Sequence, residues 1–61
     1  MVYLIRYHRE GKLLDASHWN KTLPETRRIA ATELVQRSAD YAAIFDLSEN
    51  EKLVGTVNSL V

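Results

Sequence analysis

Hydrophobic and polar positions alternate through the first third of the chain, which is the pattern of a β-hairpin. Residues 2–9 are rich in aromatic and β-branched side chains, Glu10-Gly11 supplies a turn signal, and residues 13–19 resume an extended pattern. We predict a hairpin over residues 2–19 with Glu10-Gly11 as its loop. In this register Arg6 faces Asp15, a favourable cross-strand charge pair, and Tyr7 faces Leu14.

The periodicity changes from two to about 3.6 after residue 22. Thr22 and Glu25 have the spacing of a helix capping box, and the proline between them is tolerated in a first helical turn. Ala30 and Leu34 then align on one face, whereas the opposite face is polar. The pattern predicts a helix over about residues 23–38.

Alternation of apolar positions returns at Tyr41 and predicts a second hairpin, over about residues 41–58, with residues 48–51 as its loop. Gly55 falls inside the second strand, which indicates either a bulge or a close approach by the helix. The facing pairs of this hairpin are then Ile44 with Gly55, Ala42 with Val57, and Phe45 with Val54.

The order ββαββ predicts an α+β fold, in which a four-stranded, mostly antiparallel sheet carries one helix on one face. Residues 1–61 are expected to be a single domain, because a chain this short buries only about 60% of the surface that its unfolded form exposes. The pattern does not fix the order of the strands.

One helix covers only one face of such a sheet, and the other face is predicted to be apolar as well. An apolar face of this extent on a small domain is typical of an interaction surface, and self-association is the simplest case. We therefore predict a homodimer, with another protein partner as a further possibility. The predicted interface residues are Leu4, Leu13, Trp19, Phe45 and Val54.

The composition supports a partner more than a nucleic acid or a membrane. Eight basic residues balance eight acidic ones, there is no cysteine, and no apolar run approaches the ~18 residues that a membrane helix needs. We expect a cytoplasmic chain that neither a disulfide nor a thiolate zinc site reinforces. The alternative is a nucleic-acid-binding module with a basic and aromatic surface on the first hairpin, formed by Arg6, Arg9, Lys12, Trp19 and Lys21.

No catalytic, cofactor or metal site is predicted. His8 and His18 lie at opposite ends of the expected hairpin and on opposite faces, so they cannot chelate one ion. Ser17 adjoins His18, but neighbours on a strand point to opposite faces and form no catalytic dyad. The chain also lacks a glycine-rich phosphate loop. We predict that it is not an enzyme.

Several short elements occur along the chain in a set order: a Gly-Lys-Leu turn, a tryptophan before the helix, Ala-Asp at the helix end with an alternating strand after it, and a final Lys-Leu-Val strand. The residues are Gly11-Lys12-Leu13, Trp19, Ala39-Asp40, Ile44, Asp46 and Lys52-Leu53-Val54. In these elements the layout resembles a group of short bacterial single-domain ββαββ proteins with no assigned function. The resemblance implies the fold and a bacterial origin, and it transfers no functional residue. This chain departs from the group at the second turn, which lacks the glycine often found there.

Overall fold

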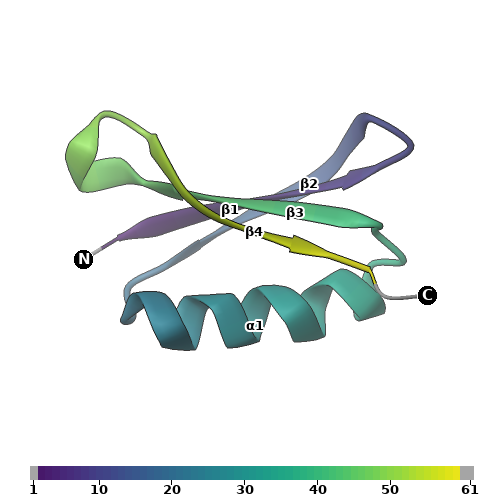
Figure 1. Cartoon of the computed structure of the whole chain (residues 1–61), viewed down its shortest axis with the longest axis horizontal. Coiled ribbons are helices and arrows are strands. Elements are labelled where there is room, and N and C mark those ends of the chain that lie inside the picture. The colour runs from purple at the N-terminus through teal and green to yellow at the C-terminus, as the bar shows by residue number, and fades with distance from the viewer. Residues whose placement is uncertain (1, 60–61) are drawn as a thin grey trace.

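The computed structural model describes residues 2–59, which form one sheet and one helix (Figure 1). The elements in chain order are β1 (Tyr3–Arg9), β2 (Lys12–Trp19), α1 (Leu23–Gln36), β3 (Tyr41–Asp46), the 3₁₀ turn η1 (Leu47–Glu49) and β4 (Lys52–Asn58). The predicted ββαββ order and α+β class are confirmed.

The strands lie in the order β2-β1-β3-β4, and every pairing is antiparallel. The two hairpins are therefore side by side, with β1 and β3 in the centre and β2 and β4 at the edges. Helix α1 lies along one face of the sheet, and both hairpin turns bend away from it (Figure 1). No helix formed by residues 2–59 lies on the other face of the sheet.

The start of α1 is the one predicted. The Thr22 hydroxyl oxygen accepts the Glu25 N–H at 3.3 Å, and the hydroxyl donates to Glu25 Oε1 at 2.9 Å. These bonds satisfy a backbone donor that the first turn of a helix leaves unpaired. Within residues 2–59, no helix has both the length and the apolar character that crossing a bilayer requires.

The helix ends at Gln36, two residues earlier than predicted, because the backbone of Ser38 is left-handed with φ of 54°. The Ala39 N–H donates to the Leu34 carbonyl at 2.9 Å, and the Ser38 N–H donates to the Val35 carbonyl at 3.1 Å. This pair of bonds is a Schellman motif, which usually has glycine at its left-handed position.

Replacing Ser38 by glycine is therefore expected to raise the free energy of unfolding by about 0.5–1 kcal/mol, because glycine adopts this backbone conformation without steric cost. Urea unfolding at one protein concentration measures the change. Ala31→Gly is the matched control, since a glycine at this exposed position inside the helix should cost about 1 kcal/mol. A loss of stability in both variants would contradict the assignment.

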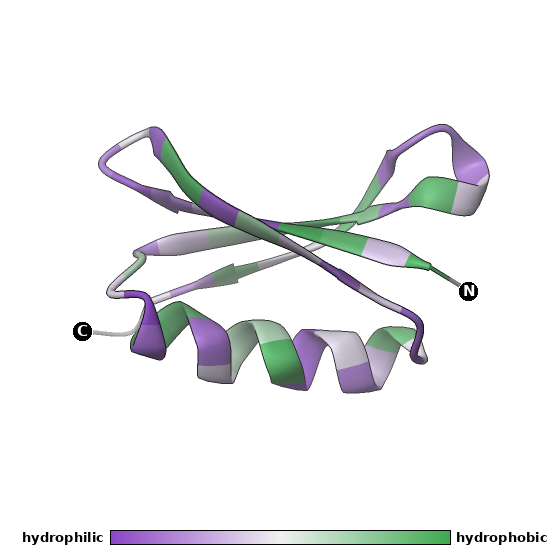
Figure 2. Cartoon of the chain, turned by 180° about the vertical axis from the view of Figure 1, so that it is seen from behind, coloured by the Kyte–Doolittle hydropathy of each residue, from purple (hydrophilic) through white to green (hydrophobic). Residues whose placement is uncertain are grey.

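The hydrophobic core lies between the sheet and α1. Ile5, Tyr7 and Ile44 from the two central strands meet Ala30 and Leu34 from the helix, and all five are buried. Figure 2 shows hydrophobic and hydrophilic residues in alternation along α1, as expected for a helix with one buried face.

The first hairpin has the predicted turn but a different register. His8 faces Leu13 as expected, but Leu14 is an extra residue in β2, so that Tyr7 faces Asp15 and Arg6 faces Ala16. The predicted pairs of Tyr7 with Leu14 and Arg6 with Asp15 are therefore wrong. The cause is a β-bulge, which places two residues of one strand opposite one residue of its partner.

The second hairpin contains a bulge as well. Ile44 faces Gly55 and Ala42 faces Val57, as predicted, but Phe45 faces Leu53 rather than Val54. Both alternatives predicted for Gly55 occur: the bulge lies next to it at Val54, and a Cβ atom at Gly55 would lie 3.2 Å from Nε of Arg27 on the helix.

Candidate functional site: the helix-free face of the sheet

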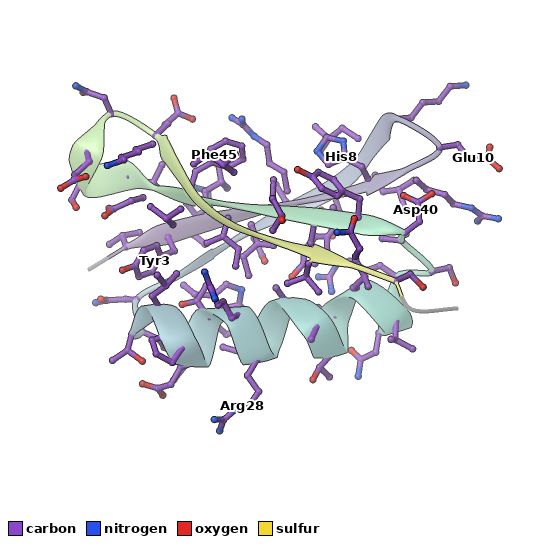
Figure 3. The ribbon with its side chains drawn as sticks, viewed as in Figure 1. Tyr3, His8, Glu10, Arg28, Asp40 and Phe45 are labelled. Carbon is purple, nitrogen blue, oxygen red and sulfur yellow. The ribbon has the colours of Figure 1, made fainter. Side chains whose placement is uncertain are left out.

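The side chains of the helix-free face follow from the strand registers, since paired residues of antiparallel strands point to the same side. Tyr3, Ile5 and Tyr7 of β1 point to the helix, so the residues between them point away from it. Figure 3 shows His8 and Phe45 on the side away from α1 and Tyr3 between the sheet and the helix. The helix-free face comprises Leu4, Arg6, His8, Leu13, Ala16, His18, Tyr41, Ala43, Phe45, Leu53, Thr56 and Asn58.

Two leucines of this face are conspicuously exposed. Leu13 keeps 58% of its surface accessible, and Leu53 keeps 52%. Leu4 and Ala43, on the central strands, are buried by their neighbours although no helix covers them. The face thus has a closely packed centre with exposed apolar side chains on both edge strands.

Arg6 crosses the centre of the face and links three strands. Its Nη2 atom lies 3.1 Å from Glu51 Oε1, next to the start of β4, and the guanidinium carbon lies 4.8 Å from the centre of the Phe45 ring. Cations over aromatic rings at exposed sites contribute about 0.5–1 kcal/mol. The charge of Arg6 is therefore neutralised within the chain, while its stem covers apolar surface.

The two histidines lie on the same face, which corrects the prediction that they lie on opposite faces. The bulge at Leu14 shifts β2 by one residue, so His18 pairs with Leu4 and shares its side of the sheet. His8 instead stacks obliquely against Tyr41, with ring centres 5.7 Å apart. They are near opposite ends of the hairpin, as predicted. Within residues 2–59, no group of three or more His, Asp or Glu side chains is arranged to hold a metal ion.

Trp19 and Val54, both expected on this face, lie on the helix side instead. Both pack against the hydrophobic core. Trp19 follows the bulge at Leu14, which reverses the side to which the rest of β2 points, and Val54 is itself the extra residue of the bulge in β4. The Trp19 Nε1–H donates to Ser17 Oγ at 2.9 Å, which fixes the indole beside the helix. Of the five predicted interface residues, the face brings together Leu4, Leu13 and Phe45.

The predicted nucleic-acid surface is not assembled. Arg6 lies on the helix-free face, and Arg9 pairs with Lys12 at the tip of the first hairpin. Lys21 and Trp19 instead line a groove beside α1. The five side chains therefore do not form one continuous surface.

A charged cluster on the helix side was not predicted. Arg37 Nε lies 3.0 Å from Asp15 Oδ2, Arg37 Nη1 lies 3.0 Å from Glu33 Oε2, and the guanidinium carbon lies 4.6 Å from the Tyr7 ring centre. The i,i+4 spacing of Glu33 and Arg37 is the sequence signal for half of this cluster. The cluster ties the end of α1 to the exposed edge strand β2.

The cluster shifts the titration of its members. The Arg37 hydrogen bond holds the pKa of Asp15 below its ordinary value, and the Ala16 N–H adds to this effect. Hydrogen bonds to Asp15 and Glu33 raise the pKa of Arg37, and burial raises the pKa of the Tyr7 hydroxyl. The charged forms of Asp15 and Arg37 are therefore favoured by their partners in the cluster, and the Tyr7 hydroxyl stays protonated.

Replacing Asp15 by asparagine is expected to lower stability near neutral pH and to have a diminishing effect as the pH falls. A carboxyl whose pKa is depressed in the folded state contributes stability above its unfolded pKa, and loses it as the pH falls through the folded pKa. Urea unfolding of both proteins at a series of pH values measures the difference. Added salt should shrink it at neutral pH, and a difference independent of both pH and salt would contradict the ion pair.

Comparison with protein-family models, with curated proteins and with solved structures finds no match to this chain. The resemblance to short bacterial ββαββ proteins therefore stays a prediction.

Proposed function

We propose that this chain is a non-catalytic, cytoplasmic protein-interaction module that forms a homodimer through the helix-free face of its sheet. The observation that carries the proposal is the exposure of Leu13 and Leu53 on a face that no element of residues 2–59 covers. Apolar side chains that stay in water at this extent mark a surface that gains free energy from a partner. Leu4, Leu13 and Phe45 are the predicted interface residues that this face retains.

A second copy suits the face because a small chain has little core of its own. A domain of about 60 residues is marginally stable alone, and association adds buried apolar area that the fold lacks. In a two-fold dimer the same patch meets itself, so each exposed leucine of one copy has apolar surface of the other within reach. The two helices would then lie on the outside of a two-sheet assembly.

The size of the face limits the area that a dimer can bury. The molecule measures 30 × 20 × 15 Å, and the sheet face occupies the longest and shortest of these dimensions. A face of this size is at the low end of stable interfaces, which bury about 800 Å² on each partner. We therefore expect a dimer that dissociates at micromolar concentrations.

The mass in solution tests the proposal. Light scattering and analytical ultracentrifugation, from about 1 to 500 μM, should show a mass that rises from one chain to two. A mass of one chain throughout this range would overturn self-association.

Binding of single-stranded nucleic acid is the second candidate, and one observation favours it. His8, Tyr41 and Phe45 place three rings on the two central strands of an open sheet, with the Arg6 guanidinium among them. Rings on an open sheet are the stacking platform of several RNA-binding domains. A titration of wild type and of Phe45→Ala with mixed single-stranded oligonucleotides at low salt tests this second candidate. Salt-sensitive binding that Phe45→Ala weakens would support nucleic-acid binding, and the absence of binding to wild type would exclude it.

A further inference from the structure

The second surface of interest is the outer edge of β2 together with a groove beside it. Helix α1 packs on β1, β3 and β4, and leaves β2 to one side. All eight residues of β2 are exposed or only half-buried. A groove of about 450 Å³ runs between this strand and the helix, with Trp19 and Lys21 on one wall and Arg28, Ile29, Thr32 and Glu33 on the other.

The second half of β2 is an unprotected sheet edge. Residues 16–19 pair with β1 on one side only, so alternate residues present their N–H and C=O groups outwards. A bulge at Leu14 and the Asp15 carboxylate, which accepts the Ala16 N–H at 2.8 Å, blunt the edge as far as Ala16, so the open part of the edge is residues 17–19. The opposite edge strand β4 differs, because Arg27 Nη2 donates to the Val54 carbonyl at 3.5 Å.

The groove has apolar walls of a length that suits an extended chain. Trp19 is held in place by its bond to Ser17, and Ile29 faces it from the helix. The helix residues along the groove run from Glu25 to Gln36, a rise of about 16 Å at 1.5 Å per residue. This length matches about five residues of an extended strand.

The charges along the groove favour an acidic occupant. Glu33 is paired with Arg37, and Glu25 accepts the Thr22 hydroxyl, so both carboxylates are already engaged. Lys21 and Arg28 form no ion pair with the side chains of residues 2–59. Arg28 extends away from the sheet at the outer rim (Figure 3), where it can fold over a bound chain.

We propose that residues 17–19 and this groove bind an extended segment of a partner protein whose groove-facing side chains, at every second position, include both apolar and acidic residues. The segment adds to the sheet as a fifth strand, with its backbone bonded to the free edge of β2. Its apolar side chains pack on Trp19 and Ile29, and its carboxylates face Lys21 and Arg28. A second copy fits this site less well, because its own β2 brings only Asp15, which Arg37 already holds.

The emission of Trp19, the chain's one tryptophan, reports binding directly. We expect a saturable change on titration with a short blocked peptide in which valine and glutamate share every second position, with threonine at the positions between, and at least about tenfold weaker binding of the same peptide with lysine for glutamate. Lys21→Glu with Arg28→Glu should reverse this preference. The matched control, Arg9→Glu with Lys12→Glu, removes the same charge at the distant hairpin tip and should bind as wild type.

Three results would overturn the proposal. The first is the absence of any saturable response to the valine–glutamate peptide at low salt. The second is equal binding of a peptide whose backbone nitrogens are methylated, since this peptide cannot add to a sheet. The third is a loss of self-association in the Lys21→Glu, Arg28→Glu variant, which would make a second copy the occupant. Binding that survives Leu53→Asp separates this site from the dimer face proposed above.

Discussion

Replacing Ile44 by alanine is expected to lower the free energy of unfolding by about 2–5 kcal/mol. Ile44 is fully buried in the central strand β3, where it faces Ile5 on one side and Gly55 on the other. Truncation removes apolar contacts and leaves a cavity that glycine cannot fill. A domain of 61 residues has a total stability of roughly 3–9 kcal/mol, so this loss is a large share of it.

The midpoint of urea unfolding, measured at one protein concentration, shows the effect. Val35→Ala is the matched control, because Val35 keeps 73% of its surface exposed on α1 and should change the stability by less than about 0.5 kcal/mol. Equal midpoints for the two variants would mean that the core does not lie between the sheet and α1. A variant that is unfolded without urea would agree with the prediction.

The parts of the fold that local signals determine were predictable from the sequence. The left-handed backbone of Glu10 and Gly11 supports the tight two-residue turn expected there. The capping box at Thr22 fixed the start of α1, and the periodicity of Ala30 and Leu34 identified its buried face. Each of these features depends on residues close together in the chain, which is why pattern alone was enough.

The two bulges were the main failure, and their signal was present in the sequence. Leu13-Leu14 and Leu53-Val54 are adjacent apolar pairs that interrupt strict alternation, and each lies at a bulge. An uninterrupted register gave an apparent ion pair between Arg6 and Asp15. The structure pairs both with other partners, Glu51 and Arg37, which are distant in sequence. Ion pairs between residues that are distant in sequence help to decide the register of a strand, but the local sequence pattern does not reveal them.

This single failure accounts for the errors in the candidate site. The bulge at Leu14 shifts the rest of β2 by one residue, which exchanges the faces of that segment: Trp19 lies on the core side and His18 on the face of His8. The bulge in β4 has Val54 as its extra residue, which packs against the core. Leu4 and Phe45 were placed correctly because they lie on the central strands, whose faces the buried alternation of β1 and β3 determines.

The helix-free face can be separated from the core by two substitutions, at Leu53 and at Trp19, of which the sequence predicted only Trp19 on that face. Leu53→Asp should keep the fold, because Leu53 is half exposed on an edge strand, but weaken dimerisation by at least about tenfold, since both copies carry the change. Trp19→Ala should instead lower the stability of the fold and leave dimerisation intact. Its half-buried indole packs on the core, so we expect a loss of about 1–3 kcal/mol of stability and an unchanged dimer wherever the chain is folded.

Sedimentation across the micromolar range measures the dissociation of the dimer, and urea unfolding measures the stability of the fold. Val35→Asp is the control for Leu53→Asp, because it places the same charge at an even more exposed apolar position on α1, away from the proposed interface. Dissociation by Val35→Asp but not by Leu53→Asp would place the dimer contact on the helix instead. Dissociation by Leu53→Asp alone would mean that the helix-free face is the contact. Both variants add the same charge, but Leu53 lies on the helix-free face of the sheet and Val35 lies on α1.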